Sequence, residues 1–137
     1  MVAPTLIDIA GHRPARVLVV DDEASIRNLL AAILTPQGYE VTLARDGDEA
    51  KLLLEQAAFD VVVTDYLIPG RLNGIDVLRF AKETHESCQV VVITGNHGPE
   101  VQEKAIRFGA VDYIPKPFSL EIINKAVANA VAISRAA

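Results

Sequence analysis

Acidic and polar side chains follow short apolar runs at several places in this chain, and their types suit the binding of a cation. Asp21 and Asp22 come directly after the apolar run at 17–20. At the end of a buried strand, two adjacent carboxylates repel each other by about 1 to 4 kcal/mol, depending on the local dielectric constant. A divalent cation would relieve this repulsion. Later apolar runs are followed by a third acid, a hydroxyl and an amine, which belong to Asp65, Thr94 and Lys116.

The elements that must position these residues are short strands that alternate with helices. Runs rich in valine and isoleucine alternate with longer segments in which apolar residues recur at helical spacing, a pattern typical of βα units and a parallel sheet. The carboxyl ends of parallel strands share one edge of an open sheet, where ligands bind, so we expect the five side chains to converge there. The predicted strands are 16–20, 39–44, 59–64, 89–93 and 111–114, and the predicted helices are 23–34, one capped by Asp46, and about 74–84, 99–108 and 119–134.

Helix ends and faces can be predicted from single residues. Asp46 can cap the second helix, with Glu49 three residues later in a box-like arrangement, and Ser119 can cap the last helix. Gly109 is expected to end the fourth helix. Helical spacing predicts inward-facing residues in the second and last helices: Leu52, Leu53 and Ala57, and then Ile122, Ile123, Ala126, Val127 and Ala130.

Composition limits the classes of function. The chain has 137 residues, half of them apolar, which suits one domain over 16–134 with a flexible leader over 1–15. Its net charge of -5 lacks the basic footprint of nucleic-acid binding. Cys88 is the only cysteine, so an intrachain disulfide and a cysteine-based metal cluster are excluded. The leader lacks the features of a signal peptide and no apolar segment approaches about 18 residues, so we expect a cytoplasmic protein without membrane contact.

Four short motifs, in this order and at these spacings, make the chain resemble a response regulator receiver domain, the phosphoacceptor module of two-component signalling. They are Val-Asp-Asp-Glu at 20–23, Thr-Asp-Tyr-Leu-Ile-Pro-Gly at 64–70, Ile-Thr-Gly at 93–95 and Lys-Pro-Phe at 116–118. The resemblance covers nearly the whole chain. It implies a doubly wound, flavodoxin-like α/β fold in which five parallel strands have the order 2-1-3-4-5.

The resemblance also implies a role for each residue at the sheet edge. Asp65 resembles the phosphoacceptor, whose carboxylate attacks a phosphoryl group in line and forms an acyl phosphate. Asp22, Asp65 and the backbone carbonyl of Leu67 resemble a Mg²⁺ site, and Asp21 resembles the acid that holds a metal-bound water. Lys116 matches the lysine that pairs with the phosphoryl oxygens. In the family, the bond from this lysine to the next proline is cis.

A second group of residues resembles the family's switch. The hydroxyl of Thr94 would reach a phosphoryl oxygen only by moving toward it, and the ring of Tyr113 would fill the space released. Gly95 would leave room for the phosphoryl group.

Other positions are expected to set the lifetime of the acyl phosphate. Leu67 and Asn96 stand where the family tunes the attacking water, and a leucine side chain cannot bind that water. The loop from Asp65 to Gly74 reaches its helix one residue later than is common in the family, so we expect residues 71–73 to bulge.

The function implied is transfer of a phosphoryl group from a histidine kinase or phosphotransfer protein onto Asp65 with Mg²⁺. Output would pass from the fourth helix, fifth strand and fifth helix to an effector protein or a second copy. We expect only self-phosphorylation and slow self-dephosphorylation, not enzymatic turnover. The alternatives are a receiver detached from a larger response regulator or hybrid kinase, a degenerate receiver that acts as a scaffold, a metal-dependent aspartyl phosphohydrolase, and a flavin-binding module, whose phosphate the two adjacent carboxylates would repel.

Overall fold

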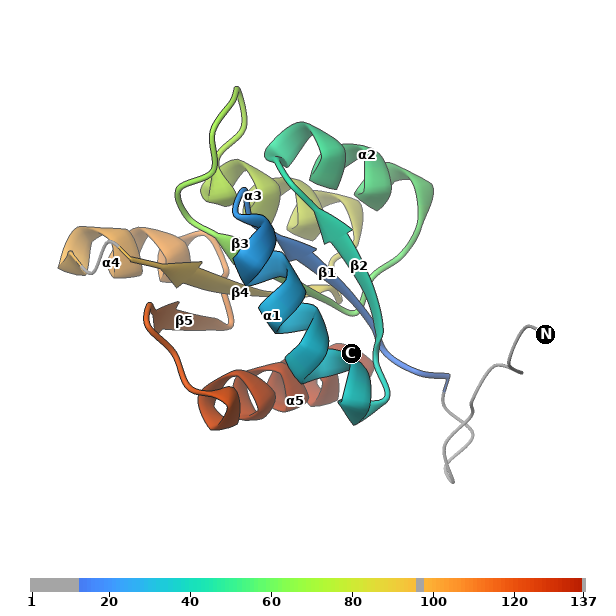
Figure 1. The fold of residues 1–137 in the computed structure, drawn as a ribbon. Helices are drawn as coiled ribbons and strands as arrows, with labels where there is room; N and C mark the ends of the chain where they lie inside the picture. The colour runs from blue at the N-terminus through green and yellow to red at the C-terminus, as the bar shows by residue number, and fades with distance from the viewer. Residues whose placement is uncertain (1–12, 96–97, 137) are drawn as a thin grey trace.

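The computed structural model describes residues 13–95 and 98–136, which form a parallel sheet between two layers of helices (Figure 1). The strand order is β2-β1-β3-β4-β5, and every pair of neighbours is parallel. The predicted α/β fold and strand order are therefore confirmed. The strands are β1 (Arg16–Val20), β2 (Glu40–Ala44), β3 (Val61–Asp65), β4 (Gln89–Thr94) and β5 (Asp112–Pro115). The helices are α1 (Ala24–Leu34), α2 (Gly47–Gln56), α3 (Gly74–Thr84), α4 (Pro99–Arg107) and α5 (Leu120–Ala136), and a 3₁₀ turn, η1 (Thr35–Gln37), follows α1.

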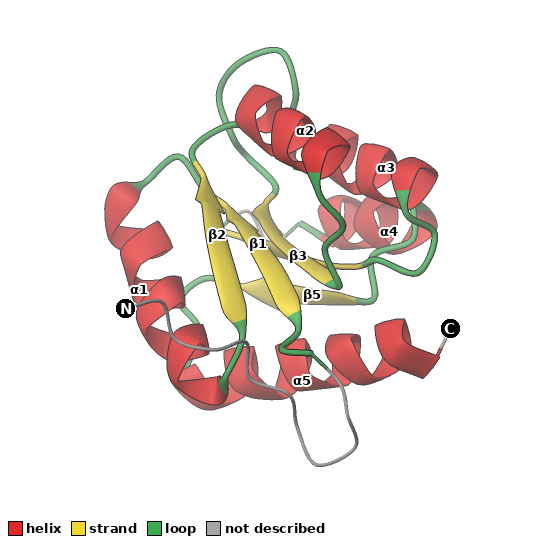
Figure 2. Cartoon of the chain, turned by 90° about the vertical axis from the view of Figure 1, so that its right-hand side faces the viewer, coloured by secondary structure: helices red, strands yellow, loops and turns green. Residues whose placement is uncertain are grey.

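Both faces of the sheet are covered, α1 and α5 lying on one face and α2, α3 and α4 on the other (Figure 2). Successive side chains of a strand point to opposite faces, so each strand contributes to two cores. Val17 and Val19 pack with α1 and α5, whereas Leu18 and Val20 pack with α2, α3 and α4. β3 is buried along its whole length. This arrangement explains the near-continuous apolar runs, which are typical of parallel strands covered on both sides.

Local caps define the helix ends. The carboxylate of Asp46 accepts a hydrogen bond from the backbone N–H of Glu49 at 2.8 Å, and the hydroxyl of Ser119 accepts one from Ile122 at 3.2 Å. Gly109 follows α4 with a φ of 103°, a left-handed conformation that favours glycine. The predicted caps of α2 and α5 and the predicted end of α4 are therefore confirmed.

Two predictions about helix faces were wrong. Leu52 is 53% exposed, and Leu54 instead enters the core beside Ala50. Ile122 is 52% exposed, although its neighbour Ile123 is fully buried. Consecutive residues of a helix are about 100° apart, so a run of adjacent apolar residues cannot all face inward.

The first residues of the described chain belong to the fold. Ala15 is buried, and its carbonyl accepts a hydrogen bond from the backbone N–H of Glu40 at 2.9 Å. Most of the predicted leader, residues 1–12, lies outside the described residues. Within the described part of the chain, every helix is too short or too polar to cross a membrane.

Cys88 lies in the turn between α3 and β4 and is fully buried. Its backbone N–H donates to the carbonyl of His85 at 2.9 Å. Burial raises the pKa of its thiol to about 12, and this effect outweighs the opposing attraction of Lys82. The thiol is therefore protonated at neutral pH and remains shielded from solvent.

Candidate functional site

Three carboxylates meet at the carboxyl edge of the sheet because two neighbouring strands end there in register. Val20 of β1 pairs with Thr64 of β3, so Asp21, which follows β1, lies beside Asp65, the last residue of β3. Asp21 is 2% exposed and Asp65 is 6% exposed, whereas Asp22 is exposed to solvent. Ligand oxygens of the three acids all lie within 4.8 Å of one another.

The ammonium group of Lys116 lies between two of these acids. Its Nζ donates to Oδ2 of Asp65 at 2.8 Å and to Oδ2 of Asp21 at 3.1 Å, and the lysine side chain is 18% exposed. The backbone N–H of Lys116 donates to the carbonyl of Thr94 at 2.8 Å, which ties the loop after β5 to the end of β4. The Lys116–Pro117 bond is cis, as the resemblance implied.

Burial and charge act in opposite directions on these ionisable groups. Burial raises the pKa of Asp21, and repulsion from Asp65 adds to this, although hydrogen bonds from Glu23 and Lys116 oppose it. Burial alone would lower the pKa of Lys116. Hydrogen bonding and attraction from Asp65 and Asp21 outweigh that effect and raise the pKa of Lys116. The lysine is therefore a fixed positive charge at neutral pH.

Backbone contacts orient Asp21, including one from a residue that the sequence analysis missed. Oδ1 of Asp21 accepts a hydrogen bond from the backbone N–H of Glu23 at 2.9 Å. The guanidinium of Arg27 donates to the backbone carbonyl of Asp21 at 2.8 Å. Arg27 lies on the first turns of α1, and a basic residue so soon after an acidic pair was the available signal in the sequence.

The loop after β3 begins with contacts to the acceptor candidate itself. The backbone N–H of Leu67 donates to Oδ1 of Asp65 at 3.2 Å, and the backbone N–H of Tyr66 donates to the carbonyl of Ile93 at 2.8 Å. At the far end of this loop, a Cβ on Gly74 would lie 2.2 Å from the carbonyl oxygen of Asp65. Position 74 therefore accommodates only glycine without moving the backbone of Asp65. The side chain of Leu67 is 58% exposed.

The predicted switch residues lie on adjacent strands. Thr94 is fully buried at the end of β4, and Tyr113 on β5 pairs in register with Val92, two residues before Thr94. The two-residue period places Thr94 and Tyr113 on the same face of the sheet. Tyr113 is partly buried against the core of α2, α3 and α4, and burial raises its pKa. A Cβ at Gly95 would meet open space, and Asn96 lies outside the described residues.

The donor set at the sheet edge fits a hard divalent cation. Asp21, Asp22 and Asp65 offer only oxygen ligands, and a backbone carbonyl of the loop after Asp65 would add another. Mg²⁺ and Ca²⁺ prefer such ligands, whereas Zn²⁺ prefers nitrogen and sulfur. At an effective dielectric constant near 20, two unit charges 4.8 Å apart repel by about 3 kcal/mol, so a cation would stabilise the cluster.

Comparisons with known proteins agree with this geometry. Residues 17–128 match the response regulator receiver domain. Response regulator MprA of Mycolicibacterium vanbaalenii is 40% identical over 108 residues, which are 79% of this chain and 46% of that protein. The chain thus spans about half the length of this curated relative.

Solved structures give the same result. The receiver domain of NtrX from Brucella abortus is 38% identical, with a TM-score of 0.80 over 85% of this chain and 98% of that one. A CheY-like receiver domain protein from Methanospirillum hungatei is 24% identical, with a TM-score of 0.84 over 89% of this chain and 97% of that one, which is a likeness of fold.

Proposed function

The chain belongs to the response regulator receiver domain family, and on this premise we propose that Asp65 accepts a phosphoryl group from a histidine kinase or a histidine phosphotransfer protein. The observation that supports this most strongly is the contact of Lys116 Nζ with Asp65 at 2.8 Å inside a cluster of three carboxylates. A buried acid beside a fixed positive charge and a cation site is suited to phosphoryl transfer, in which positioning and charge stabilisation supply most of the catalysis.

In the proposed transfer, an oxygen of the Asp65 carboxylate forms a bond to phosphorus while the bond from phosphorus to the donor's imidazole nitrogen breaks. The imidazole keeps the electron pair of that bond and is protonated. Asp22, Asp65 and the carbonyl of Leu67 would hold Mg²⁺, with Asp21 holding one of its waters. Bound Mg²⁺ supplies positive charge to the phosphoryl oxygens. Lys116 would exchange its contact with Asp65 for one with the new phosphoryl group.

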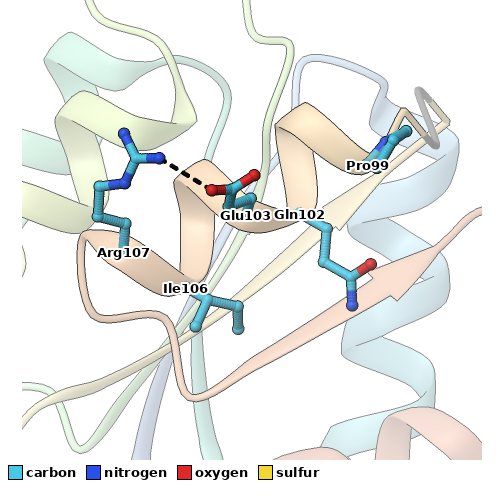
Figure 3. Close-up of a pocket in the computed structure, with 5 residues that line it drawn as sticks. All are labelled: Pro99, Gln102, Glu103, Ile106 and Arg107. Carbon is cyan, nitrogen blue, oxygen red and sulfur yellow. Dashed lines mark hydrogen bonds and ion pairs between the residues drawn. The ribbon is translucent and has the colours of Figure 1, made fainter.

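We place the output surface on α4, β5 and α5. Thr94 would move toward the phosphoryl group at the end of β4, which leads into α4, and Tyr113 would follow on β5. The outer side of α4 carries a shallow pocket of about 440 Å³ lined by Pro99, Gln102, Glu103, Ile106 and Arg107 (Figure 3). Ile106 on α4 and Ile122 on α5 are both about half exposed, so this surface offers apolar contacts to an effector or a second copy of the chain.

The setting of this function is also a proposal. We take residues 16–134 as the receiver domain and place the protein in the cytoplasm, where it would exchange phosphoryl groups with its partner without contacting nucleic acid or a membrane. Apart from accepting the phosphoryl group of its partner, the chain would carry out only self-phosphorylation from small donors and slow self-dephosphorylation.

The proposal is tested by incubating the chain with Mg²⁺ and a small acyl phosphate and measuring its intact mass. We expect one added phosphoryl group, stable in acid and labile in base. Asp65→Asn should add none, and Glu55→Gln, which changes an exposed acid on α2, should react like the parent. An Asp65→Asn variant that gains the same mass would overturn the assignment. Multiple turnovers of a phosphate ester would instead favour the phosphohydrolase alternative.

A further inference from the structure

The loop between β3 and α3, residues 66–73, is closed at its base and projects beside the start of α2 (Figure 1). The backbone N–H of Gly74 donates to the carbonyl of Tyr66 at 3.0 Å, which joins the two ends of the loop. Asn73 and Asp76 form a reciprocal capping box, with bonds of 2.9 and 3.0 Å, which fixes the entry into α3. The loop is thus held firmly at both ends, and the position of its middle depends on other contacts.

Those contacts come from the first residues of α2. A Cβ on Gly47 would lie 2.5 Å from Cβ of Leu72 and 2.6 Å from its carbonyl oxygen, so the loop backbone rests directly on this buried glycine. Beside it, the guanidinium of Arg71 donates to Oδ1 of Asp48 at 3.0 Å. The extra length of the loop, which the sequence analysis expected to bulge at residues 71–73, is therefore packed on α2.

The contact at Gly47 does more than the Arg71–Asp48 ion pair to fix the position of the loop. The side chains of Arg71 and Asp48 are 80% and 55% exposed, and an exposed pair of this kind contributes only about 0 to 1 kcal/mol. In contrast, a backbone oxygen cannot turn away as a flexible side chain can, so any atom added at position 47 must displace the loop. We therefore take Gly47 as the point that determines where the loop lies.

The start of α2 is itself fixed to the candidate site. The backbone N–H of Asp21 donates to the carbonyl of Ala44 at 3.1 Å, at the end of β2. Two residues later, Asp46 caps α2. At the start of the loop, the backbone N–H of Leu67 donates to the carboxylate of Asp65. Contacts thus run from Asp21 through the start of α2 and the loop back to Asp65.

We propose that the first turn of α2 is a positioning element for the cation site: the contact between Gly47 and Leu72, assisted by Asp48 and Arg71, fixes the loop that presents the backbone carbonyl of Leu67. This inference rests on the proposed function, in which that carbonyl is a ligand. Mg²⁺ demands near-ideal geometry with ligands at about 2.0 to 2.1 Å, so a displaced loop costs affinity even when every acid is intact.

The test is Gly47→Ala, with Mg²⁺ affinity measured by NMR titration well below the melting temperature. We expect about tenfold weaker Mg²⁺ binding, the low end of the loss seen when a group that supports a metal ligand is removed. Without Mg²⁺, amide exchange at Leu67 and Ile68 should be faster than in the parent. Alanine favours a helix over glycine, so the variant has no reason to lose α2 itself. Glu55→Ala, at the far end of α2, is the matched control and should leave both readouts unchanged.

A second variant keeps the proposal testable if the first does not fold. Leu72→Gly leaves α2 intact and removes the Cβ that lies against Gly47, so it should weaken Mg²⁺ binding in the same direction but less. Parent-like Mg²⁺ affinity in a folded Gly47→Ala or Leu72→Gly variant would overturn the inference. If instead the parent binds no Mg²⁺, or Asp22→Ala binds it as well as the parent, the proposed function itself fails.

Discussion

Replacing Lys116 with methionine should destabilise the Mg²⁺-free protein at neutral pH, because the change removes the ammonium group that lies between Asp21 and Asp65. At an effective dielectric constant near 20, its ammonium is attracted by about 6 kcal/mol to the Asp65 oxygen at 2.8 Å and by about 5 kcal/mol to the Asp21 oxygen at 3.1 Å. Desolvation of the ammonium offsets much of this attraction. Removing one partner of a buried ion pair costs about 3 to 5 kcal/mol, and the 18% exposure of Lys116 places the expected loss near the lower value, about 3 kcal/mol.

The loss should depend on pH in a defined direction. Because the pKa of Lys116 is raised in the folded protein, its contribution to the free energy of unfolding is complete below the ordinary lysine pKa of 10.5. That contribution is lost only at higher pH. In the variant, the pKa of Asp21 rises further, since Lys116 no longer lowers it. A carboxyl group with a raised folded-state pKa makes stability fall as pH rises above the ordinary value of 3.8. The difference in free energy of unfolding between variant and parent should therefore be small near pH 3.8 and largest at neutral pH.

Urea unfolding with a chelator present, at several pH values, measures this difference. Mg²⁺ titration of the same variant should show tighter binding than in the parent, because the ammonium no longer competes for two carboxylates. Equal stability of variant and parent at neutral pH, or a loss of the same size at every pH, would refute the electrostatic reasoning.

Three further predictions concern the same site. Asp21→Asn should raise the free energy of unfolding at neutral pH without Mg²⁺, because burial makes the charged form of this acid costly. Urea unfolding should show that this gain disappears in acid, where the parent's carboxyl group is protonated. A gain that does not depend on pH would contradict this reasoning. Leu67→Asn should speed loss of the acyl phosphate by roughly threefold or more, because the asparagine amide can bind the attacking water. This effect is well below the roughly 10²-fold or greater effect of a dedicated general base. Intact mass measured over time follows the decay, and equal decay rates in the variant and the parent would refute this prediction. A beryllofluoride phosphate mimic should alter amide exchange in Pro99–Arg107 and at Tyr113, and changes confined to α1 and α2 would reject the proposed output surface.

Much of the fold could be predicted because the local signals agreed with the tertiary structure. The predicted helix 74–84 has the observed bounds, since Asn73 caps its start. The third strand was predicted two residues too early. Phe59 is apolar and buried, but pairing with β1 begins only where Val17 meets Val61, and this register is a tertiary property that the sequence of one strand does not contain.

The sequence was enough to predict at which edge of the sheet the candidate site lies, but not the contacts between its side chains. An acid that directly follows a buried parallel strand must lie at the ligand-binding edge, so the neighbourhood of Asp21, Asp22 and Asp65 followed from the pattern. The double contact of Lys116 with Asp21 and Asp65 could not be predicted from pattern alone, because it depends on the path of the loop after β5. The packing of Leu72 on Gly47 was equally hidden, since neither residue belongs to a recognisable motif.

The burial of Cys88 makes this chain convenient for site-specific labelling. A thiol that is fully buried and protonated at neutral pH reacts slowly with maleimides, because the thiolate is the reactive species. A new cysteine at an exposed position such as Ile106 or Ile122 would therefore take up a fluorophore or spin label selectively, without replacing the native residue. Pairs of such labels on α4 and α5 could follow motion of these helices in real time against an otherwise natural background.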